Sequence, residues 1–154
     1  MYKTDRKKTV VLLFAFILTA VFSITTVHAR KSEAPRYTIQ ITLDDVVAIG
    51  TLDNTPTTRD FIAQLPLTVK LDDYSATEKI TYLPNKLTTQ GTPAGITPNI
   101  GDITYYAPWG NIAIFYQNFS YSHGLIKLGE ITHGLEHFHY RGSRQATIEL
   151  VDKN

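Results

Sequence analysis

The stretch Gly101–Gly129, GDITYYAPWGNIAIFYQNFSYSHGLIKLG, indicates the fold class of this chain. It contains three alternating or fully apolar runs, ITYYA, NIAIFYQNF and GLIKLG. The runs are separated by Pro108-Trp109-Gly110-Asn111 and by Ser122-His123-Gly124. Short apolar runs bounded by Gly, Pro, Asn and Ser are typical of β-strands joined by tight turns. The stretch therefore predicts three consecutive strands.

The segments on either side extend this β pattern. Tyr37 to Leu43 alternates between apolar and polar residues, and Val46 to Leu52 returns after Asp44-Asp45, which predicts a hairpin. Further strands are predicted over residues 67–71, 78–83 and 145–151. The predicted core consists of Ile39, Ile41, Phe61, Leu67, Val69, Ile112, Ile114, Leu128 and Ile148.

Two short helices are predicted, near 55–65 and 132–140. Asn54 or Thr55 can cap the first helix, Pro56 suits its first position, and Pro66 ends it. Between the helices, residues 88–99 are rich in Gly, Pro and Thr and are expected to form a long loop. About eight mostly antiparallel strands with two short helices predict a closed barrel whose open ends the helices plug.

The first 29 residues have the pattern of a secretory signal peptide. Basic residues precede an apolar run over Val10–Phe22, and Val27-His28-Ala29 offers a cleavage site. We therefore expect a signal peptide over 1–29, a linker over 30–36, a folded domain over 37–154, and a periplasmic or extracellular location. The alternative is that the apolar run stays uncleaved as a membrane anchor.

Composition excludes several classes of function. Residues 30–154 contain 11 basic and 13 acidic residues, a net charge of −2 with His neutral. No basic patch is left that would favour nucleic acid or, after cleavage, a membrane surface as partner. The chain has no Cys, which excludes disulfides and thiol chemistry.

Eight short motifs distributed over Tyr37–Val151 resemble the bacterial cyclophilin-like domain family. They are Leu52-Asp53-Asn54, Leu65-Pro66-Leu67-Thr68, Glu78-Lys79, Tyr82-Leu83-Pro84, Gly101-Asp102-Ile103, Pro108-Trp109-Gly110-Asn111, Ile114-Phe115-Tyr116 and the run Gly124–Gly129. The resemblance implies a cyclophilin-like barrel in a family whose members are exported or fused to flavodoxin-like domains. It implies no particular activity, because fold alone does not define function.

Resemblance to true cyclophilins would imply prolyl isomerisation, with an Arg beside an apolar proline pocket. Their Phe-His-Arg strand and Gln-Gly-Gly-Asp-Phe segment are missing, and Arg59 falls on the first predicted helix. No catalytic residue is assigned. We expect an exported binding or accessory domain without isomerase activity. The alternatives are a divergent isomerase or a partner domain of a separate redox protein.

Other reactive groups are expected to be structural. His133 and His137 are four residues apart, but a zinc site needs three or four converging ligands, so a solvated helix is expected there. Asp102 is expected to cap a turn, and Glu78-Lys79 to form a solvated or cross-strand charge pair. No metal site and no cofactor are predicted.

A candidate ligand site is predicted around Trp109. An aromatic ring in a tight turn offers rigid apolar area for a peptide or a small molecule. Its candidate neighbours are Tyr82, Tyr106 and Tyr116, and residues 88–99 are a candidate lid. The alternative is that all four aromatic residues only pack the barrel.

Overall fold

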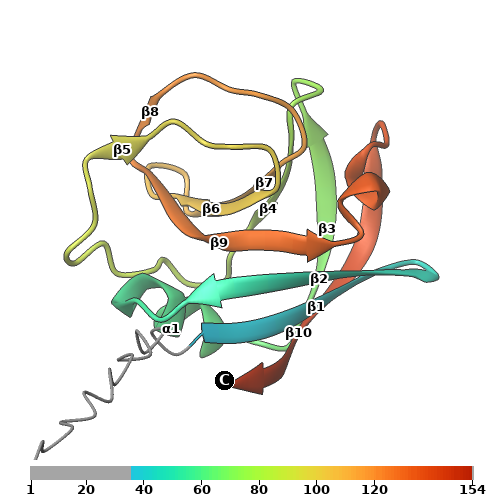
Figure 1. Cartoon of the computed structure of the whole chain (residues 1–154), viewed down its shortest axis with the longest axis horizontal. Coiled ribbons are helices and arrows are strands. Elements are labelled where there is room, and N and C mark those ends of the chain that lie inside the picture. The colour runs from blue at the N-terminus through green and yellow to red at the C-terminus, as the bar shows by residue number, and fades with distance from the viewer. Residues whose placement is uncertain (1–35, 154) are drawn as a thin grey trace, which may run out of the picture. The chain divides into compact units, whose positions relative to one another are not determined.

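The computed structural model describes residues 36–153, which form a closed antiparallel barrel of eight strands (Figure 1). The strands follow the order β1-β10-β3-β4-β7-β6-β9-β2, and β2 pairs back onto β1. Their bounds are β1 Arg36–Leu43, β2 Val46–Asp53, β3 Leu67–Tyr74, β4 Glu78–Tyr82, β6 Asp102–Tyr106, β7 Asn111–Phe115, β9 Leu125–His133 and β10 Ser143–Lys153. The predicted barrel is confirmed. The predicted signal peptide lies outside the described residues, as does the linker apart from Arg36, which begins β1.

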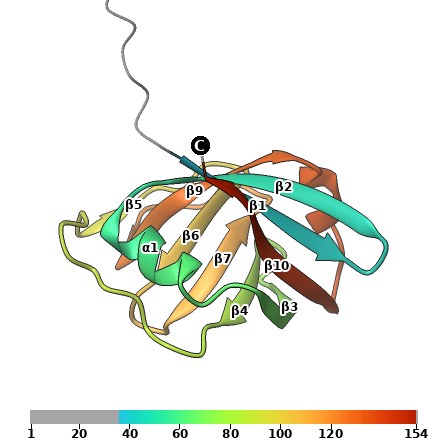
Figure 2. The ribbon, with the colours of Figure 1, turned by 90° about the horizontal axis from the view of Figure 1, so that it is seen from below.

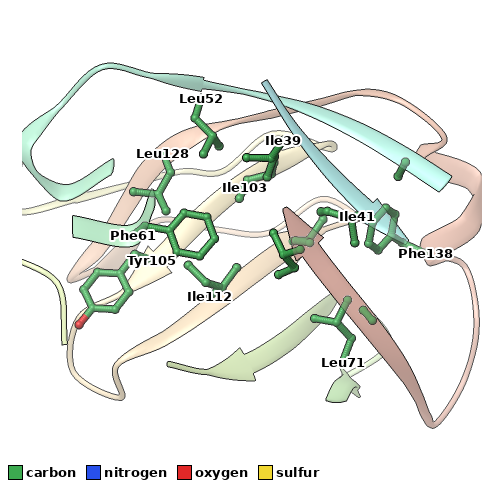
Figure 3. Packing of buried hydrophobic residues seen from close by; sticks show 14 of the residues in the cluster. Ile39, Ile41, Leu52, Phe61, Leu71, Ile103, Tyr105, Ile112, Leu128 and Phe138 are labelled. Carbon is green, nitrogen blue, oxygen red and sulfur yellow. The ribbon is translucent and has the colours of Figure 1, made fainter. Parts of the chain in front are cut away.

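The barrel interior is filled by every second residue of the strands. Successive side chains of a strand point to opposite faces, so the odd-numbered residues of β1 from Tyr37 to Leu43 are buried while their neighbours are only half-buried. Figure 3 shows Ile39, Ile41, Ile103 and Ile112 meeting inside the barrel. Of the predicted core, only Leu67 and Val69 are half-buried, and both pack against the buried cluster.

Helix α1, Pro56–Ile62, forms where its capping residues predict it (Figure 2). The Thr55 hydroxyl accepts a hydrogen bond from the Thr58 backbone N–H at 3.1 Å. Phe61 points from this helix into the interior beside Tyr105 and Leu128 (Figure 3). The helix has seven residues, and no helix within 36–153 is long and apolar enough to cross a bilayer.

The second predicted helix is reduced to one 3-10 turn, η1, Leu135–Phe138. The start of the predicted segment belongs instead to β9, because His133 still pairs with Ile49 of β2. Gly134 then turns the chain with φ of 79°, and η1 follows. Phe138 is nonetheless fully buried, and Figure 3 shows it at the opposite side of the core from Phe61. The two short elements therefore close the core from two sides.

Two further strands form a small sheet that the sequence did not reveal. Strand β5, Gly95–Ile96, lies within the predicted long loop, and β8, Ser122–His123, lies in a predicted turn. Their pairing is extended by a hydrogen bond from the Gly124 N–H to the Ala94 carbonyl at 2.7 Å. Strands of two residues are too short to show the alternation on which a strand prediction rests.

Candidate functional site

The outer face of β4, β6, β7 and β9 carries a second apolar cluster. Outward-pointing residues of neighbouring strands lie in register there, because Tyr106 of β6 is opposite Asn111 of β7 and Leu125 of β9. One step along the sheet, Ala113 of β7 is opposite Ile80 of β4. The buried members of this cluster are Ile80, Ala113, Phe115 and Leu125, with Ile96 and Tyr106 packed against them.

A cleft of about 170 Å³ opens on this outer face. Trp109 forms edge-to-face contacts with Tyr74, at 5.7 Å between ring centroids and 86°, and with Tyr106, at 5.6 Å and 73°. Phe115 and Phe119 pack against each other at 5.7 Å. We call this site the aromatic cleft; its lining residues are Tyr74, Glu78, Tyr106, Trp109, Asn111, Ala113, Phe115, Phe119, Ser122 and Leu125.

Local backbone geometry places Trp109 over the cleft. It lies in the turn between β6 and β7, which the Gly110 N–H closes by donating to the Tyr106 carbonyl at 2.9 Å. Gly110 has φ of 74°, a conformation that glycine adopts without strain. Pro108 packs so closely on Gly124 that a Cβ atom added to Gly124 would lie 2.8 Å from the Pro108 ring. The turn is thereby held against the start of β9.

Two hydrogen-bond acceptors in the aromatic cleft have no donor. Asn111 is 2% exposed; its amide Nδ2 donates to the Ile112 carbonyl at 3.1 Å, while its buried Oδ1 has no partner. The half-buried Glu78 carboxylate has no hydrogen-bond or ion-pair partner among the described residues. Burial raises the pKa of Glu78 to about 7. Unmatched acceptors at a buried or half-buried site are costly, so each needs a donor from outside the chain, such as a ligand or water.

The structure brings two of the four predicted site residues together, Trp109 and Tyr106. Tyr116 instead points into the barrel, where it is 7% exposed and donates to Asp73 Oδ1 at 2.5 Å. Tyr82 is 59% exposed and lines a separate hollow with Leu67 and Pro84.

Sequence reasoning missed Tyr74, Glu78, Asn111, Phe115 and Phe119 as residues of the aromatic cleft. For Asn111 and Phe115 the signal is strand alternation, because they share one face of β7 with Ala113. The predicted lid also lies elsewhere, since residues 90–93 and Ile96 line a second hollow beside Thr55 and Lys127.

Lys79 forms a cross-strand charge pair, as one of the two predicted alternatives for Glu78-Lys79 has it, because Asp73 of β3 is opposite Lys79 of β4. Glu78 takes no part in this pair, because the two side chains point to opposite faces of β4. Lys79 is fully buried inside the barrel, where its Nζ lies 2.5 Å from Asp73 Oδ1 and donates to the Tyr140 carbonyl. Nζ also lies 3.9 Å from the centroid of the Tyr140 ring and 4.5 Å from that of Tyr116.

These contacts move the pKa values of the buried charges. Burial lowers the pKa of Lys79. Burial alone would raise the pKa of Asp73, but hydrogen bonds from Lys79 and Tyr116 outweigh it and lower that pKa. Because Lys79 is sealed from solvent and fully paired, we assign this network to barrel stability.

The remaining reactive groups also have structural partners. Asp102 accepts from the Asn99 N–H at 2.9 Å and pairs with Lys127 at 2.7 Å, which confirms the predicted turn cap. Arg59 donates to Asn54 Oδ1 at 2.7 Å on the surface. Within residues 36–153, no three His, Asp or Glu side chains converge as a metal site would require.

Fold and site together define a closed antiparallel barrel with an aromatic cleft on its outer face. The sequence matches the profile of the cyclophilin-like family over residues 41–149, and the chain belongs to this family. A similar solved structure is the solution structure of a hypothetical protein from Archaeoglobus fulgidus. It is 14% identical, with a TM-score of 0.57, and the match covers 79% of this chain and 99% of that one. At this identity the likeness shows the shared fold. No curated protein matches the sequence.

Proposed function

We propose that this cyclophilin-like domain is a binding module whose site is the aromatic cleft, and that it does not catalyse prolyl isomerisation. The observation that carries the proposal is the combination of aromatic walls with two acceptors, on Glu78 and Asn111, that lack donors. A concave, mostly apolar site with a small number of polar groups is the usual form of a ligand pocket.

The absence of isomerase chemistry is supported by the positions of the arginines. No guanidinium group lines the aromatic cleft. Arg59 lies on α1 and bonds to Asn54. A proline-containing test peptide should therefore isomerise at the same rate with and without the protein. Acceleration that is lost on Arg59→Ala would instead support a divergent isomerase.

Binding is tested by titrating the ¹⁵N-labelled protein with a set of single-ring compounds that carry positive, negative or no charge. We expect saturable chemical-shift changes at the amides of Asn111, Ala113 and Phe115. Trp109→Ala should abolish these changes without altering the melting temperature, because Trp109 is 46% exposed. Shifts centred on another surface, or none with any compound, would contradict a site in the cleft.

Export is the second part of the proposal, and the basic, apolar and small-residue pattern of residues 1–29 supports it. N-terminal sequencing of the secreted protein should begin at Arg30. Recovery of the full-length chain from the membrane fraction would support an uncleaved anchor instead.

A further inference from the structure

We propose that the ligand of the aromatic cleft is a small primary ammonium compound, held by the faces of its aromatic rings and by the Glu78 carboxylate. This inference rests on the proposed function, because it assigns a ligand class to the same site.

The ring arrangement suits a cation. The Trp109 ring stands at 86° to Tyr74 and at 73° to Tyr106, so three rings border the cleft in different orientations. An aromatic face carries partial negative charge, and a cation within about 6 Å of a ring centroid is attracted to it. Trp gives the strongest such interaction, and sites built from several rings are known to bind quaternary ammonium groups and methylated lysine.

The polar groups of the cleft favour a ligand with a positive charge. Among the ten lining residues, Glu78 is the only one with a carboxyl, ammonium, guanidinium or imidazole group. A cation restores the electrostatic stabilisation that the carboxylate lost when it was removed from water. A neutral ligand leaves the carboxylate unpaired, and an anion is repelled by it.

Hydrogen bonding to Glu78 narrows the class of cation. A primary ammonium group carries three N–H donors, which can form charge-assisted hydrogen bonds with the Glu78 carboxylate. A quaternary ammonium ion has none. Asn111 Oδ1 also lacks a donor, but Glu78 is opposite Phe115, and Asn111 is four residues further along β7. At about 3.3 Å per residue, one ammonium group does not reach both acceptors. Glu78 therefore favours a primary over a quaternary ammonium ion.

The volume limits the size of the ligand. The cleft measures about 170 Å³, close to a cavity of roughly 150 Å³ that holds one benzene molecule. A single ring or a short alkyl chain fills this space beside the ammonium group. Benzylammonium and n-butylammonium are therefore suitable probes.

The chain offers a built-in reporter, because Trp109 is its only tryptophan. The fluorescence of Trp109 is measured while the protein is titrated with benzylammonium, benzyl alcohol or benzoate, which share a ring and differ in charge. We expect benzylammonium to bind at least about tenfold more tightly than benzyl alcohol, which corresponds to about 1.4 kcal/mol, and benzoate not to bind. Equal binding of benzyl alcohol would overturn the inference and leave the proposed function intact. Absence of binding by all three would overturn both.

Glu78→Gln keeps the shape of the side chain and removes its charge. It should reduce benzylammonium affinity about tenfold, while benzyl alcohol affinity stays unchanged. Glu136→Gln is the matched control, because Glu136 is an exposed carboxylate on η1 that also contributes one negative charge. Equal losses in both variants would attribute the effect to net charge and contradict a site at Glu78.

Two further ligands test the details of the class. Tetramethylammonium should bind more weakly than n-butylammonium, because it cannot donate a hydrogen bond to Glu78; the reverse order would exclude such a hydrogen bond. N-acetyl-lysine methylamide presents the same ammonium on a peptide backbone. If it binds more than tenfold more tightly than n-butylammonium, the ligand is a lysine side chain rather than a small free amine, and the assignment is overturned.

Discussion

Glu78 and Lys79 are neighbours in β4, yet strand alternation gives them opposite environments. Lys79 points inward and satisfies its charge with Asp73 and two tyrosine rings. Glu78 points outward into the aromatic cleft and has no partner there. One charge is therefore part of the barrel's stabilising core, while the other is an unsatisfied group in a candidate binding site.

The Glu78→Gln variant should change how stability depends on pH. In the folded protein burial raises the pKa of Glu78 from 4.5 to about 7. Between these values the folded state holds a proton that the unfolded state has released, so the free energy of unfolding falls as pH rises. Glu78→Gln has no carboxyl group to titrate, so its free energy of unfolding should not fall in this way. Near pH 8 the variant should therefore be more stable than the natural protein by about 1–2 kcal/mol, a value that is reduced because Glu78 is partly exposed. Urea unfolding of both proteins near pH 4.5 and pH 8 measures this difference in stability. An equal change in the free energy of unfolding of the two proteins between these pH values would contradict a raised pKa of Glu78.

The Lys79→Met variant should destabilise the barrel by about 3–5 kcal/mol, because it leaves Asp73 without its cation in a buried site. Combining it with Asp73→Asn should recover part of the loss, since the uncompensated charge is then gone. Lys70→Met is the control: Lys70 is exposed and pairs with Asp72 at 3.4 Å, so its loss should cost less than about 1 kcal/mol. Urea denaturation of the four proteins measures these effects, and a small loss for Lys79→Met would show that the buried pair is dispensable.

At the scale of elements, the turn between β6 and β7 and the short β5–β8 sheet border the aromatic cleft from two sides. The turn supplies Trp109, and β8 supplies Ser122. Both are anchored at Gly124, which lies against Pro108 and donates to the Ala94 carbonyl. The shape of the cleft thus depends on segments that add little to the barrel core.

Gly95→Ala should loosen the β5–β8 sheet and leave the barrel intact. A Cβ at Gly95 would lie 2.3 Å from the Ser122 carbonyl oxygen, so the two strands must separate. We expect amide hydrogen exchange at Gly124 to accelerate about tenfold or more, while exchange at Ile114 is unchanged. Gly91→Ala is the control, because no atom lies within 4 Å of its Cβ position. Unchanged exchange at Gly124 would show that the sheet adapts without opening.

Most of the eight strands were predictable from the sequence because they bury one face, which produces a period of two. β6 and β7 are buried on both faces and were predictable as short apolar runs bounded by turn residues. The site was less predictable. Alternation shows that Tyr105 and Tyr106 point to opposite faces, but it does not show which face is the interior. Tyr116 was assigned to the site for this reason, although it is Phe115 that points outward. Tyr74 and Phe119 reach the cleft only through strand order and loop path, which no local pattern records.

At the scale of the whole molecule, two apolar clusters have separate roles. The interior cluster joins every barrel strand except β4 with α1 and η1, whereas the outer cluster involves only β4, β6, β7 and β9 with Ile96 of β5. Substitutions in the interior cluster should lower the stability of the whole domain. Substitutions at the exposed edge of the outer cluster should change the aromatic cleft.

Phe61→Ala should lower the free energy of unfolding by about 3–5 kcal/mol, because it empties a fully buried site of the interior cluster. Phe119→Ala, at a residue that is 43% exposed, should cost less than about 1 kcal/mol. Thermal and urea unfolding compare the two variants. Similar losses would contradict the separation of the clusters.

The pairing of β1 with both β2 and β10 has a consequence for the order of folding. The β1–β2 hairpin is local in sequence, but Tyr37 is opposite Lys153 and Leu43 is opposite Ala146. β10 also pairs with β3, so in the barrel formed by residues 36–153 it is the strand that joins β1 to β3. On the ribosome, a nascent chain shorter than about residue 143 therefore lacks the segment that completes the structure. Such distant pairings slow folding, because loop-closure entropy is lost before the contacts form. We conclude that the domain acquires its native state after translation of β10, and that earlier intermediates expose surfaces that chaperones would bind.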